Sequence, residues 1–73
     1  MTVKGIIAQN LLQERTRHGL TQEDLAYAIG MSPCYLRRIE HGTANPSVLV
    51  LQKIAEPLGI SVAMLTSKTT LKK

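Results

Sequence analysis

Two adjacent arginines, Arg37 and Arg38, are the residues of this sequence that point most directly to a chemical role. A guanidinium group can donate paired hydrogen bonds to the O6 and N7 atoms of guanine, and it can also bind a phosphate. On a helix of about 100° per residue, Cys34 and both arginines point away from Leu36 and Ile39. The alternative is that the pair is only a solvated helix face, as paired arginines on an arbitrary helix usually are.

The helix that carries the arginines is predicted to follow another short helix after a tight turn. Thr21 and Ser32 are favourable N-caps, and Pro33 suits the first position of the second helix. Gly30 can adopt the left-handed conformation that a sharp corner needs, and the small Ala26 faces this corner. The inner faces of the two helices are formed by Gln22, Leu25, Ala26 and Ile29 and by Ser32, Leu36 and Ile39. Segment 21–41 therefore predicts a helix-turn-helix whose second helix, about 32–40, fits the major groove of DNA.

Three more helices are predicted, which makes the fold all-α. The first should cover residues 3–17, with an apolar stripe formed by Ile7, Ala8, Leu11 and Leu12. A fourth should begin after the cap Ser47 and end or bend near Pro57, because proline removes a backbone donor. A short fifth helix should follow the cap Ser61. The core positions of these last two helices are Val48, Leu51, Ile54, Ala55, Leu58, Val62 and Leu65.

Length and composition predict one small domain, residues 1–66, and a basic mobile tail, residues 67–73. A chain of 73 residues buries only about 60% of its unfolded surface, so a partner subunit would help to stabilise it. The formal net charge of +4 and the pI near 9.7 fit a polyanionic partner, although Lys68, Lys72 and Lys73 belong to the tail. Two tyrosines, without Phe or Trp, are too few to stack on a single strand, so duplex DNA is the better partner.

Several function classes are disfavoured by what the sequence lacks. No run of about 18 apolar residues and no secretory signal is evident, so we expect a cytoplasmic protein and no membrane partner. The lone Cys34 agrees with a reducing compartment; its neighbours can favour a thiolate and a redox role, but a small groove-facing side chain is the simpler interpretation. His18 and His41 have no acidic or cysteine cluster beside them. We therefore expect no metal, no cofactor, no small-molecule ligand and no catalytic site.

A charged residue lies near the middle of the apolar stripe of the first helix. Arg15 needs a partner there, and Glu40 is the acid that the third helix offers at the edge of its inner face. We predict a partly buried ion pair that ties the first helix to the helix of the arginines. The alternative is that Arg15 extends to solvent.

A second surface is predicted from apolar residues outside the core stripe of the fourth helix. Leu49 and Val50 lie on the side that also carries Lys53 and Pro57, where no internal partner is expected. Together with Met64 of the fifth helix they predict a homodimer interface. The alternative is that they are scattered surface residues, which are common.

The order of the helices and a spread of residues resemble the phage-repressor family of helix-turn-helix domains, often called Cro- or Xre-like. The matching residues are Arg15, 19–26, Gly30, 32–36, Ile39, Glu40, Gly42, 45–47 and 58–60. The resemblance covers nearly the whole chain and implies a compact five-helix, lambda-repressor-like DNA-binding domain. Segment 21–27 is also similar to the small controller proteins of restriction-modification systems.

The resemblance further implies which residues contact DNA. Gln22 would contact a phosphate at the positive end of its helix. The groove-facing positions would be Ser32, Pro33, Cys34, Arg37 and Arg38. Tyr35 would lean toward a phosphate, or more simply pack against the preceding helix. Thr43 and Asn45 would hold the DNA backbone, and the alternative for both, as for Gln22, is a role in caps and turns only.

These features predict a sequence-specific transcriptional regulator that binds double-stranded DNA as a homodimer on a pseudo-palindromic operator. Two recognition helices about 34 Å apart would then enter successive major grooves. The competing interpretation is a protein-interaction module or an antitoxin on the same scaffold. An antitoxin would need a longer partner-wrapping extension than the predicted tail provides.

Overall fold

Each of the five helices begins directly after a serine or threonine whose hydroxyl oxygen accepts a hydrogen bond from the first turn. The structure is a computed structural model that describes residues 2–67, and the regular elements in this range are all α-helices. They are α1 (Val3–Arg17), α2 (Gln22–Ala28), α3 (Pro33–Glu40), α4 (Val48–Leu58) and α5 (Val62–Thr66). The five-helix prediction is confirmed, whereas residues 68–73 of the predicted tail lie outside the described residues.

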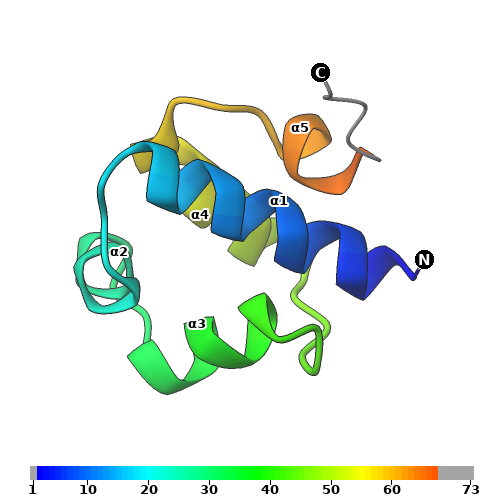
Figure 1. The fold of residues 1–73 in the computed structure, drawn as a ribbon, viewed down its shortest axis with the longest axis horizontal. Coiled ribbons are helices and arrows are strands. Elements are labelled where there is room, and N and C mark those ends of the chain that lie inside the picture. Colours follow the sequence, from blue (N-terminus) through cyan, green and yellow to red (C-terminus); the bar gives the residue numbers. More distant parts are fainter. Residues whose placement is uncertain (1, 68–73) are drawn as a thin grey trace.

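Helix α1 forms the centre of the fold. It lies between α3 and α5, with α4 behind it and α2 near one end (Figure 1). Seven fully buried side chains, drawn from all five helices, fill the space between them: Leu11, Leu25, Leu36, Ile39, Ile54, Leu58 and Leu65. Because every helix contributes to one core, α3 is held by the rest of the domain. No helix in residues 2–67 combines the length and the apolar character needed to cross a membrane.

The turn between α2 and α3 has the predicted conformation. Gly30 has a φ of 67°, in the left-handed region, and the backbone N–H of Met31 donates to the carbonyl oxygen of Ala26 at 2.8 Å. Ala26 is fully buried at the corner. In Figure 1, α2 is seen end-on while α3 lies in the plane of the picture, so the two helices cross steeply. Together they form the predicted helix-turn-helix.

Three positions predicted to face inward do not. Leu12 is 43% exposed, Val48 is 62% exposed, and Ser32 is also exposed. Leu12 lies one residue, about 100°, beyond the buried Leu11 and therefore outside the covered arc of α1. Val48 is the first residue of its helix, and Ser32 is a cap that precedes its helix. Helix α4 ends at residue 58, within the range that its proline predicts.

The side chain of Asn10, on α1, holds α5 against the core through a contact that was not predicted from the sequence. Its Nδ2 atom donates to the carbonyl oxygens of Leu65 at 2.8 Å, Ser67 at 2.8 Å and Met64 at 3.3 Å. Asn10 itself is buried. The last carbonyls of a helix lack partners within the helix, and α5 has only five residues. Asn10 therefore supplies a donor that this short helix needs.

Candidate nucleic-acid interface

The outer face of α3 is the candidate interface. Ser32, Cys34, Arg37 and Arg38 are exposed there, while Leu36 on the opposite face is fully buried. Helix α3 lies at the edge of the domain, and none of the other described helices covers its outer side (Figure 1). Two guanidinium groups beside small side chains can approach base edges and phosphates without steric hindrance. The structure thus leaves accessible the face on which the sequence places the arginines.

The predicted ion pair lies behind this face. Arg15 Nε donates to Glu40 Oε2 at 2.5 Å and Arg15 Nη2 donates to Glu40 Oε1 at 3.1 Å. The remaining Nη1 atom of Arg15 donates to the carbonyl oxygen of Leu20 at 2.7 Å. The two side chains are only 12% and 4% exposed. The pair is therefore partly buried, as predicted, and doubly hydrogen-bonded, and the alternative in which Arg15 extends to solvent is wrong.

Gln22 connects the ion pair to the outer face of α3. Its Nε2 atom donates to Glu40 Oε1 at 3.0 Å, and its Oε1 atom accepts from Arg37 Nε at 3.4 Å. This link between Gln22, Glu40 and Arg37 was not predicted from the sequence. The sequence did contain a signal for the bond between Gln22 and Glu40, because both residues are predicted at the inner sides of helices that pack together.

The other predicted contact residues differ in exposure. Pro33 and Tyr35 are half-buried, and Tyr35 packs against the core. Thr43 is exposed, and its hydroxyl donates to a carbonyl oxygen in the last turn of α3 at 3.1 Å. Asn45 is exposed in the loop that follows. The hydroxyl of Ser32 accepts two backbone N–H groups of α3, which is a capping role.

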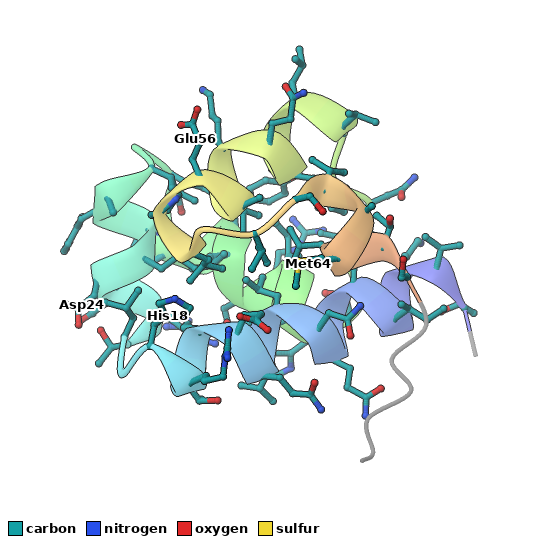
Figure 2. The ribbon with its side chains drawn as sticks, turned by 90° about the horizontal axis from the view of Figure 1, so that it is seen from above. His18, Asp24, Glu56 and Met64 are labelled. Atoms are coloured by element: carbon teal, nitrogen blue, oxygen red, sulfur yellow. The ribbon has the colours of Figure 1, made fainter. Side chains whose placement is uncertain are left out.

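The residues predicted to form the dimer interface differ in whether they have contacts within the domain. Leu49 is 71% exposed and Met64 is also exposed. Val50, however, is half-buried and packs against the core, so the expectation that it has no internal partner is wrong. A shallow groove on this side of α4 is lined by Ser47, Leu49, Val50, Gln52, Lys53 and Glu56. Glu56 points away from the body of the domain (Figure 2). Leu49 is therefore exposed to solvent in a groove that is also lined by the cationic Lys53 and the anionic Glu56.

The two histidines lie at helix ends. His18 is the C-cap of α1, and its Nδ1 atom lies 2.8 Å from the carbonyl oxygen of Glu14. His41 is the C-cap of α3. In the part of the chain that the structure describes, no group of three His, Cys, Asp or Glu side chains could hold a metal ion. The positions of both histidines are thus explained by their roles as C-terminal caps of helices.

Comparison with known proteins agrees with this geometry. The family model described as Helix-turn-helix, HTH_3, matches residues 11–65. An uncharacterized HTH-type transcriptional regulator, y4dJ of Sinorhizobium fredii, is 35% identical over 69 residues, which are 94% of this chain and 90% of y4dJ. The immunity repressor of Bacillus phage phi105 is 36% identical over 67 residues, and the matched region of this chain spans 46% of that repressor.

A solved structure points the same way. The restriction-modification controller protein C.AhdI from Aeromonas hydrophila superposes with a TM-score of 0.81 at 34% identity, over 85% of this chain and 94% of that chain. The helix-turn-helix geometry, the accessible arginine face and these similarities agree with one another. The chain therefore belongs to the helix-turn-helix family of DNA-binding transcriptional regulators.

Proposed function

We propose that this protein is a sequence-specific transcriptional regulator that binds double-stranded DNA with the outer face of α3 in the major groove. The observation that carries the proposal is the exposed pair of Arg37 and Arg38 on a helix whose opposite face is fully buried. The arginines supply donors for guanine edges or phosphates, and the buried face fixes how the helix is presented. Such a regulator would act in the cytoplasm, where its operator would lie.

The active form that we propose is a homodimer on a pseudo-palindromic operator. A single eight-residue recognition helix contacts one half-site, and two copies related by a two-fold axis contact two. Leu49 of one copy would pack against Leu49 of the other, with Lys53 of each copy near Glu56 of its partner. The exposure of Leu49 and the opposite charges that line its groove support this arrangement.

Selection of binding sites from random DNA duplexes tests the proposed function. We expect a site with two inverted half-sites about 10 base pairs apart, centre to centre. We also expect the affinity to fall steeply as salt is raised, because bound phosphates release counterions. A protein that enriches no duplex, even at low salt, would be the competing protein-interaction module or antitoxin and not a DNA-binding regulator.

Arg37→Ala and Arg38→Ala should each weaken binding to the selected site by about 1–3 kcal/mol and relax the preference at one base position. The reason is that each change removes a guanidinium group from the accessible face of α3. Arg17→Ala is the matched control, since it removes the same charge from an exposed arginine of α1. Titration of selected and altered duplexes measures both effects. Equal weakening on all duplexes would mean phosphate contact without base recognition.

Leu49→Glu should convert the dimer to a monomer and abolish simultaneous binding of both half-sites. A two-fold contact would replace the packing of Leu49 against Leu49 by two adjacent carboxylates, which would repel each other and lose hydration. Leu12→Glu is the control, because Leu12 is an exposed leucine of α1 outside the proposed interface. Sedimentation with and without the selected duplex reports the outcome. If the Leu49→Glu protein stays dimeric, the interface lies elsewhere.

A further inference from the structure

We infer that Gln22 is a positioning residue that orients Arg37 for base recognition and transmits that orientation from the buried Arg15–Glu40 pair. The inference rests on the proposed function and assigns a specificity role within the same interface. It concerns a residue of α2, whereas the bases would be contacted by α3. The resemblance implies instead that Gln22 contacts a phosphate directly.

The chemistry of its two neighbours fixes which way the Gln22 amide faces. The carboxylate of Glu40 can only accept hydrogen bonds, so it must face the NH2 group of Gln22, 3.0 Å away. The guanidinium of Arg37 can only donate, so it must face the amide oxygen, 3.4 Å away. The amide therefore has one orientation that satisfies both partners. Because Glu40 is almost fully buried and held by Arg15, this orientation is tied to a rigid part of the core.

The bond to Gln22 also determines how Arg37 can meet DNA. It uses the Nε–H of the guanidinium and leaves the four N–H groups of the two Nη atoms. Those two atoms form the end of the side chain, and they are the pair that can contact O6 and N7 of one guanine. At 3.4 Å the bond is long, so the restraint is modest. In the described residues, the Arg38 side chain has no such hydrogen bond, which makes Arg38 an internal reference.

A pair of double-mutant cycles tests the inference. Gln22→Met is combined with Arg37→Ala and, in the matched control, with Arg38→Ala. The quantity measured is the ratio of affinities for the selected duplex and for the duplex altered at the base pair whose preference each arginine mutant loses. We expect Gln22→Met to reduce the ratio for the Arg37 position roughly three- to tenfold, within the range of coupling between neighbouring residues. In the Arg37→Ala background it should have no further effect, and the ratio for the Arg38 position should not change.

The other outcomes are distinguishable. A loss that is equal on all duplexes, and additive with both arginine mutants, would identify Gln22 as a phosphate contact and overturn the inference while leaving the proposed function intact. If the wild-type protein selects no site, the proposed function fails and the inference fails with it. Gln22→Leu covers the case in which Gln22→Met unfolds, because leucine also removes both the donor to Glu40 and the acceptor for Arg37. It should reduce the ratio at the Arg37 position as Gln22→Met does; a folded Gln22→Leu protein that keeps the wild-type ratio would also overturn the inference.

Discussion

Replacing Glu40 by alanine is expected to lower the free energy of unfolding by about 3–5 kcal/mol, the largest effect that we predict for a single substitution. The carboxylate of Glu40 accepts hydrogen bonds from Arg15 and from Gln22. Its loss leaves the guanidinium of Arg15, only 12% exposed, with the single carbonyl oxygen of Leu20 as partner. The cost is mainly that of a buried charge without a counter-ion. Chemical denaturation of the wild type and the mutant measures it.

An exposed ion pair of the same domain provides the control. Glu14 pairs with Arg17, whose side chain is 68% exposed, so Glu14→Ala should change the stability by no more than about 1 kcal/mol. The double mutant Arg15→Met with Glu40→Met should recover most of the loss, because it removes both buried charges and keeps their volume. A Glu40→Ala protein that unfolds at the wild-type midpoint would show that the pair is not buried in solution.

Asn10→Leu is expected to lower the free energy of unfolding by about 2–3 kcal/mol. The two side chains are similar in size, so the change removes the donor without opening a cavity. Three carbonyl oxygens at the end of α5 then lose their common partner, and an unmade hydrogen bond in a buried site costs about 1–3 kcal/mol. Asn10→Asp should be worse at neutral pH, because a carboxylate would face those oxygens with no proton to donate.

Hydrogen exchange adds a local measurement to this prediction. Backbone amides of α5 should exchange faster in Asn10→Leu than in the wild type, whereas those of α3 should follow global unfolding. Gln9→Leu is the matched control, since Gln9 is the exposed neighbour of Asn10 on α1. Unchanged stability together with unchanged protection of α5 would mean that the side chain of Asn10 does not hold this helix.

Local signals in the sequence predicted most of the fold. The four caps Thr21, Ser32, Ser47 and Ser61 lie where hydroxyl side chains precede apolar periodicity, and each caps a helix. Such signals depend on neighbouring residues and need no knowledge of the tertiary structure. The ion pair was also predictable, because a charge within an apolar stripe demands a partner and few acids are available.

Apart from Val48 and Ser32, which lie at the starts of their helices, the errors and omissions depend on how the helices are placed in space. Whether Leu12 is covered depends on which arc of α1 the other helices reach, and periodicity alone does not give that arc. Val50 packs against the core although it lies beside the main stripe of α4. Asn10 donates hydrogen bonds to carbonyl oxygens more than 50 residues away in the sequence. No local sequence pattern around an asparagine on a helix predicts such distant partners. Within the candidate site, the exposed arginines were predictable, whereas the bond between Arg37 and Gln22 required the crossing of α2 and α3.

The unequal tethering of the two arginines has a consequence for the evolution of binding specificity. In residues 2–67, Arg38 makes no side-chain hydrogen bond or ion pair, so substitutions there alter the surface offered to DNA and leave the core unchanged. Arg37 is bonded to Gln22, and through it to the buried carboxylate of Glu40. Replacing Arg37 removes one hydrogen-bond partner of Gln22, and replacing Gln22 removes two hydrogen bonds, the one to Arg37 and the one to Glu40. Relatives that diverge to new operators can therefore vary position 38 in single steps, whereas positions 22 and 37 are expected to change together.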